Sequence, residues 1–278
     1  MCNEACGSSP TSTSQQSTFD PILLKDERVL ERLLTRERHY LPRCDYFTFV
    51  QTEIKPFMRK LVVEWMFEIC EESLCEDDVF PLSVNILDRF LSVAVIRKTK
   101  FQLLGTACLF LSSKLKETHA LRAEKLVIYT DDSITMDELL NWEILILNEL
   151  KWDISAIVPN DFLEYLFVRM QMSERVNLAF IRKNAQTYIA LCYIDFLFST
   201  LNAPSMIAGA AVCAAFEGLR VQLGPQCPTR MQLIEMLSQI IGVDKDCLVQ
   251  CRQRMEIVLT ASPSLGQNHA ATPSSMVA

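Results

Sequence analysis

Glycine is scarce in this chain, as are the patterns that usually mark catalytic chemistry. The 278 residues include 7 glycines, and none of them forms a phosphate-binding loop. The 3 histidines are scattered and lack the spacing of metal ligands. No pair of a nucleophile and a general base stands out. The sequence therefore predicts no catalytic residues, no metal site and no cofactor.

Positive charge is also limited. The chain has 27 basic and 34 acidic residues, for a net charge of −7, and no long basic cluster. This balance argues against nucleic acid as a partner. Residues 1–10 have neither the basic start nor the apolar stretch of a signal peptide. We expect neither export nor a membrane partner.

The cysteines lack the spacing of a metal site or a disulfide framework. There are 11 of them, an odd number, and no C-x-x-C occurs. Cys70, Cys108, Cys192 and Cys213 lie in apolar helical contexts. We expect reduced thiols that act as small hydrophobic side chains.

Two segments have the composition of buried central helices. They run over 105–114 and 208–217, begin with Gly and Ala, and admit a first charge only at Lys114 and Glu217. A helix that is apolar on all sides belongs in a core, and small side chains let its neighbours approach closely. The matching positions predict an all-α chain built from two copies of one five-helix bundle.

Helical periodicity and turn residues divide the chain into four regions. We predict a disordered lead over 1–25, an N-terminal helix plus the first bundle over 26–155, the second bundle over 156–259, and a disordered tail over 260–278. Thr135 and Glu138 form a T-x-x-E capping box. The expected bundle helices are near 54–73, 78–93, 99–116, 121–130 and 135–150, then 160–170, 174–196, 203–220, 229–241 and 244–259.

The first bundle helix carries more apolar surface than one packing face needs. Phe57, Leu61 and Trp65 form one stripe, while other apolar residues occupy the remaining sides. Periodicity alone favours burial of both faces in a crowded bundle. The alternative is a shallow exposed groove for a short apolar peptide.

Two charges stand in apolar surroundings. Lys114 ends an otherwise uncharged helix, and Glu143 interrupts the run Trp142–Leu147. A buried charge is costly unless it is paired or reaches water. Each residue therefore belongs either to a structural ion pair or to the polar rim of a hydrophobic interface.

At these residues the chain resembles the cyclin family. Residues 58–65, Met-Arg-Lys-Leu-Val-Val-Glu-Trp, resemble the helix that opens the cyclin box, and 85–92 and 102–107 with Ser113-Lys114 resemble the next two helices. Finer features resemble D-type cyclins, and the likeness runs from Asp26 to Leu259. These features are Cys70-Glu71-Glu72 with Cys75-Glu76, and the segments 79–82, 123–131, 150–152 and 183–187.

The resemblance implies two tandem cyclin boxes in a non-catalytic, activating subunit of cyclin-dependent kinases four and six. It implies action at the G1/S transition, retinoblastoma-family substrates, and location in nucleus and cytoplasm. The residues matching the family's kinase contacts are Lys114 and Glu143. The groove that takes substrates and inhibitors with an R-x-L motif matches Met58, Leu61, Trp65, Glu68 and Gln102.

The tails match the D-type pattern only in part. Thr272-Pro273 matches the phosphorylated Thr-Pro that marks D-type cyclins for export and degradation. The L-x-C-x-E motif that docks the retinoblastoma protein has no match, because residues 1–6 contain no leucine. The alternative function is a cyclin-box protein of the transcription machinery.

Overall fold

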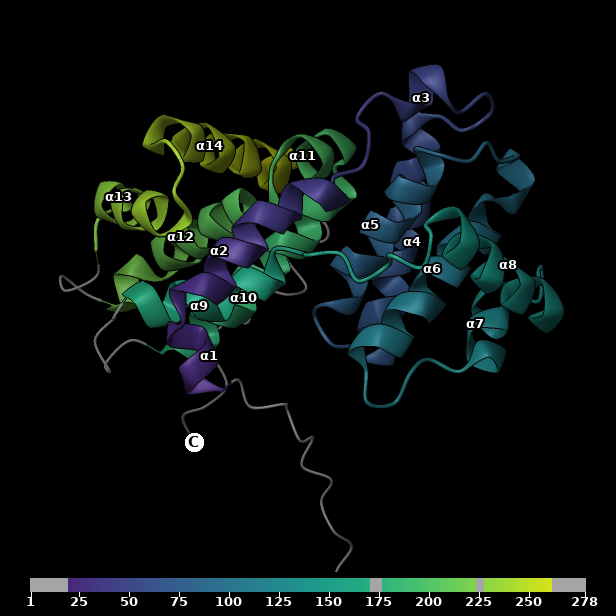
Figure 1. Ribbon diagram of the computed structural model, residues 1–278, viewed down its shortest axis with the longest axis horizontal. Helices are drawn as coiled ribbons and strands as arrows, with labels where there is room; N and C mark the ends of the chain where they lie inside the picture. The colour runs from purple at the N-terminus through teal and green to yellow at the C-terminus, as the bar shows by residue number, and fades with distance from the viewer. Residues whose placement is uncertain (1–19, 171–176, 224–227, 262–278) are drawn as a thin grey trace, which may run out of the picture.

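The computed structural model describes residues 20–170, 177–223 and 228–261, and every regular element in these ranges is a helix (Figure 1). Four short elements come first: α1 (Pro21–Lys25), α2 (Glu27–Arg36), η1 (Glu37–Tyr40) and α3 (Tyr46–Phe49). The first bundle contains α4 (Pro56–Ser73), α5 (Val79–Leu91), η2 (Lys98–Lys100), α6 (Phe101–Lys116), α7 (Ala123–Tyr129) and α8 (Met136–Glu149). The second contains α9 (Asn160–Met170), α10 (Leu178–Ile194), α11 (Phe196–Leu201), α12 (Pro204–Leu223), α13 (Arg230–Ile241) and α14 (Lys245–Ala261). The predicted all-α fold of two tandem bundles is confirmed.

The two central helices are α6 and α12, as predicted. α6 packs against α4, α5 and α8, and α12 packs against α9, α10, α13 and α14. A Cβ added at Gly105 would lie 2.9 Å from Val62 Cγ1, and one at Gly209 would lie 3.3 Å from Leu248 Cδ1. Each bundle therefore uses a glycine to bring a neighbouring helix close to its central helix.

The helix predicted near 174–196 ends earlier, because Asp195 starts a separate helix. The Asp195 carboxylate accepts a hydrogen bond from the Phe198 N–H at 2.7 Å, which caps α11. The uncharged stretch 196–216 is thus divided between α11 and α12, with Pro204 at the start of α12. In the part of the chain that the structure describes, none of the helices has the length and apolarity needed to cross a bilayer.

α1 and α2 pack against the second bundle. The prediction placed residues 1–25, which include α1, in a disordered lead and grouped the N-terminal helix with the first bundle. α1 and α2 contact α9, and Figure 1 shows both helices over the second bundle. Arg169 on α9 donates a hydrogen bond to the Leu24 carbonyl at 2.7 Å. Glu37 accepts from the N–H and the hydroxyl of Ser205, at 2.7 and 2.8 Å, at the start of α12. Long-range polar contacts of this kind leave no signal in helical periodicity.

Buried Glu37 makes part of the stability depend on pH. Burial raises the pKa of its carboxyl, although the hydrogen bonds from Ser205 and the charge of Arg38 act in the opposite direction. A raised folded-state pKa contributes stability at low pH that is lost as pH rises through that pKa. We therefore expect wild type to gain stability relative to Glu37→Gln as pH falls from neutral toward 4.5, the ordinary pKa of a glutamate side chain.

Urea unfolding of both proteins at several pH values measures this difference. Glu31→Gln, at an exposed position of α2, is the matched control. A difference between wild type and Glu37→Gln that does not change with pH would contradict the expectation.

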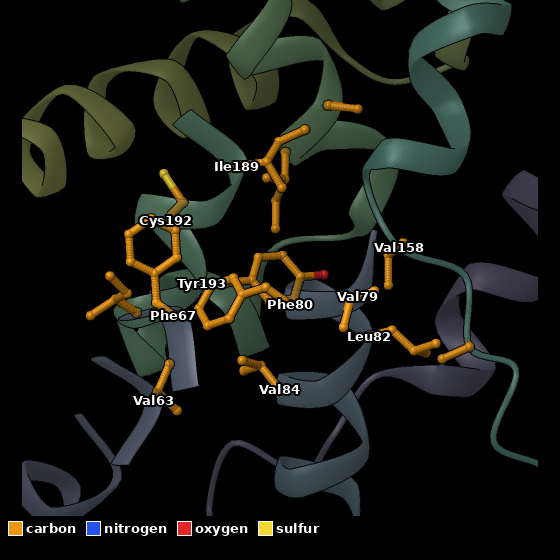
Figure 2. Close-up of a cluster of buried hydrophobic side chains, with 14 of the residues drawn as sticks. Val63, Phe67, Val79, Phe80, Leu82, Val84, Val158, Ile189, Cys192 and Tyr193 are labelled. Atoms are coloured by element: carbon orange, nitrogen blue, oxygen red, sulfur yellow. The ribbon is translucent and has the colours of Figure 1, made fainter. Parts of the chain in front are cut away.

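An apolar cluster joins the two bundles. Figure 2 shows Phe67 of α4, Phe80 of α5 and Tyr193 of α10 lying together between the bundles. All three are buried, and α10 contacts both α4 and α5. The bundles therefore share a hydrophobic interface.

A buried arginine lies at the same junction. Arg59 of α4 has no exposed surface and pairs with Asp88 of α5 at 2.8 Å. Its Nη1 donates to the carbonyls of Tyr193 and Ile194 at 2.9 and 2.7 Å, at the end of α10. Burial by itself would lower the pKa of Arg59, but Asp88 raises it overall, so the guanidinium stays charged. One side chain thus connects two helices of the first bundle to the second.

Candidate interaction surfaces

The second apolar stripe of α4 lies at the protein surface. Phe57 is 62% exposed and Leu61 is 60% exposed. Trp65 and Met58 are half-buried and pack against the core. The residues on the opposite side of the helix, Val63, Met66, Phe67 and Cys70, are buried. Burial of both faces, which periodicity favoured, is therefore wrong for Phe57 and Leu61, because the neighbouring helices cover one side of α4 only.

Polar groups border this stripe. Glu68 is exposed and follows Trp65 by one helical turn, so it continues the line of Leu61 and Trp65. On α6, Gln102 is half-buried one turn before Gly105, the point where α4 and α6 approach closely. The Ser133 hydroxyl donates to Gln102 Oε1 at 3.4 Å. The stripe thus has the Gln102 amide at its edge and the Glu68 carboxylate at its end. This arrangement suits a peptide that carries one apolar and one cationic side chain.

Lys114 and Glu143 meet in an ion pair. Lys114 Nζ lies 2.7 Å from Glu143 Oε1 and 3.9 Å from the centroid of the Phe110 ring. The Lys114 side chain is 42% exposed, and the Glu143 side chain is 12% exposed. The ammonium therefore keeps solvent-accessible donors while Glu143 and the ring fix its position.

Exposed apolar residues surround this pair. Leu140 and Ile144 lie three residues before and one after Glu143 on α8, and they are 41% and 50% exposed. Leu115, beside Lys114, is 45% exposed. The structural ion pair is therefore confirmed, and exposed apolar residues lie next to it on α6 and α8. In Figure 1, α6 lies between α4 and α8, and it packs against both.

Three further points concern the phosphorylation site, metal binding and the buried charges. Thr272 lies outside the described residues. Within those residues, no three His, Cys, Asp or Glu side chains are grouped as metal ligands would be. Sequence reasoning missed Arg59 and Asp88. Arg59 stands four residues before Val63 and seven before Met66, on their buried face, and a charge on that apolar stripe was the available signal.

Known protein families and relatives match almost the whole chain. A model described as "Cyclin, N-terminal domain" matches residues 28–155, and one described as "Cyclin, C-terminal domain" matches 157–274. G1/S-specific cyclin-D2 of Xenopus laevis is 49% identical over 250 residues, covering 90% of this chain and 85% of the relative. G1/S-specific cyclin-D2 of Gallus gallus is 50% identical over 243 residues, covering 87% and 83%.

Among solved structures, a viral cyclin from herpesvirus saimiri is similar, with a TM-score of 0.74 and 27% identity. It matches 84% of this chain and 97% of the viral one. The tandem bundles, the family models and these relatives all indicate the same family. The chain belongs to the cyclin family, within its D-type branch.

Proposed function

We propose that this cyclin is the activating, non-catalytic subunit of a cyclin-dependent kinase of the four or six kind. It promotes the G1/S transition through phosphorylation of retinoblastoma-family proteins. Its relatives carry the name G1/S-specific cyclin-D. The observation that carries the proposal is the Lys114–Glu143 pair within an exposed apolar surface.

The geometry suits a kinase-binding face. Leu140 and Ile144 offer apolar area to a partner helix, and the Lys114 ammonium has donors left for backbone carbonyls of the kinase. A subunit that binds the active arrangement of a kinase more tightly shifts the kinase toward it. In a protein kinase, that arrangement requires the Lys–Glu ion pair of the active site to be in place. The cyclin itself performs no chemical step.

The second proposed surface is a docking groove for R-x-L motifs, formed by Met58, Leu61, Trp65, Glu68 and Gln102. The exposed leucine and half-buried tryptophan would contact the leucine of the motif. The Glu68 carboxylate would pair with its arginine. Substrates and inhibitor proteins with such motifs are the expected ligands, whereas nucleic acid and membranes are not.

The tail and the cellular location complete the proposal. We assign the protein to the nucleus and the cytoplasm. Thr272, which precedes Pro273, is the proposed phosphorylation site for export and degradation.

The test of kinase choice is titration of the purified cyclin with purified kinases four and six and with the kinase of basal transcription. The proposal predicts submicromolar binding to four or six and none to the transcription kinase. The reverse preference would favour the alternative, a cyclin of the transcription machinery.

Truncating Leu61 tests the groove without disturbing the core. Because the side chain is 60% exposed, Leu61→Ala should change the free energy of unfolding by no more than about 0.5 kcal/mol. Binding of an R-x-L peptide should weaken about tenfold, near 1.4 kcal/mol, as expected for a central apolar contact. Calorimetric titration of the peptide measures this.

The matched control is Ile257→Ala on α14, where an exposed aliphatic side chain is truncated in the second bundle. It should bind the peptide like wild type. Equal peptide affinity in wild type and Leu61→Ala would remove Leu61 from the groove.

A further inference from the structure

A separate cleft opens where the two bundles meet. Its volume is about 80 Å³, and it lies between the end of α4, the loop into α5 and one face of α10. Leu61 and Cys70 are about two and a half helical turns apart, so the cleft and the α4 stripe lie on opposite sides of that helix. Its lining includes Phe67, Glu71, Glu76, Asp77, Phe80 and Thr187.

The floor of the cleft is apolar and aromatic. The rings of Phe67 and Phe80 pack edge to face with centroids 5.2 Å apart. Figure 2 shows both rings beside Cys192 and Tyr193, so the floor continues into the cluster that joins the bundles. Cys70 and Ala190 add further apolar lining. Such a floor favours the aliphatic part of a long side chain, or the flat face of a cation.

The rim of the cleft is acidic. Glu71, Glu76 and Asp77 line it together with a single cation, Lys183, whose Nζ lies 3.0 Å from Asp77 Oδ1. Glu117 brings another carboxylate close, because its Oε1 accepts from the Glu76 N–H at 2.8 Å.

Glu76 lies among other carboxylates at this rim. The pKa of Glu76 is raised, first by burial and then by the negative charges of Glu117, Asp77 and Asp78, against the opposing effect of Lys183. Lys116, at the end of α6, is held between Asp78 and Asp161 at 3.3 and 3.2 Å. The cleft therefore presents negative potential over an apolar floor.

We propose that this cleft binds an arginine side chain from a basic segment of a protein partner, independently of the R-x-L groove. The arginine stem would lie along the Phe67 and Phe80 rings, and its guanidinium would face Glu76. Arginine fits better than lysine because its planar guanidinium stacks on aromatic rings and pairs with carboxylates through two hydrogen bonds.

The test is fluorescence anisotropy of the full-length cyclin with a fluorescein-labelled peptide, Gly-Ser-Arg-Arg-Ser-Gly. A peptide with citrulline in place of both arginines removes the charge and keeps the shape. We expect the citrulline peptide and the Glu76→Gln variant each to weaken binding by about tenfold or more. Glu149→Gln, an equal charge change at the exposed end of α8, should leave the affinity within about twofold of wild type.

A second variant blocks the cleft without changing its charge. Thr187→Phe on α10 places a ring at the mouth of the cleft without altering any charge, and it should abolish binding while the helical circular dichroism is kept. Three outcomes would overturn the proposal. These are equal losses in Glu76→Gln and Glu149→Gln, unchanged binding to Thr187→Phe, and a tenfold loss in Glu68→Gln, the carboxylate of the α4 groove, with none in Glu76→Gln. The last would place the arginines in the α4 groove.

Discussion

Lys114→Glu should abolish stimulation of kinases four and six by this cyclin. The substitution removes an ammonium that lies next to exposed apolar residues of α6 and α8, and it puts a carboxylate beside Glu143. Losing a charged anchor at an interface centre costs roughly 2 kcal/mol or more, about a 30-fold loss of affinity. Kinase pull-down and a phosphorylation assay measure the loss.

A charge swap distinguishes lost binding from lost folding. Lys114→Glu alone sets two carboxylates together, and the Glu143 side chain is only 12% exposed, so some destabilisation is expected. Combining Lys114→Glu with Glu143→Lys restores an internal ion pair of opposite orientation. The double variant should recover thermal stability and still fail to bind the kinase.

The matched control is Lys245→Glu, because Lys245 pairs with Glu235 on the surface of the second bundle. It should activate the kinase like wild type. Full activation by the double variant would contradict the proposed role of Lys114.

Arg59→Met should lower the free energy of unfolding by about 3–5 kcal/mol, the cost of removing one partner from a buried ion pair. Methionine fills much of the same space, so the loss reflects polar groups left without partners. These groups are the Asp88 carboxylate and the carbonyls of Tyr193 and Ile194. Urea unfolding followed by circular dichroism measures the effect.

Comparison with an exposed ion pair shows how much of the stability loss is due to burial of Arg59. Arg28→Met breaks the ion pair of Arg28 with Asp26, in which the arginine side chain is 85% exposed, and it should change stability little. Restoring neutrality with Asp88→Asn in the Arg59→Met background should recover part of the loss. Equal effects of Arg59→Met and Arg28→Met would show that the buried network does not hold the bundles together.

Much of the fold is predictable because its signals are local. Helical spacing and the T-x-x-E box at Thr135 and Glu138 require only neighbouring residues, and the capping box forms as predicted. The uncharged, small-sided segments 105–114 and 208–217 predicted the central helices. The structure adds that a side chain at Gly105 or Gly209 would press on a neighbouring helix. Asp195 was missed as a helix start, because a single capping residue in an apolar segment carries little weight against periodicity.

The surfaces were harder to predict because exposure depends on distant packing. Lys114 and Glu143 each stood out in the sequence, but their pairing depends on how α6 and α8 pack. Periodicity identified the stripe containing Leu61 without showing which neighbours cover it. The docking of the N-terminal helices on α9 depends on Arg169, far along the chain.

The most direct test of the central claim is one rate measurement. Purified kinase four or six phosphorylates a fragment of the retinoblastoma protein, alone and with an equal amount of this cyclin. The proposed role predicts a low rate without the cyclin, a much higher rate with it, and no phosphorylation by the cyclin alone. The same rate with and without the cyclin, for both kinases, would contradict the account.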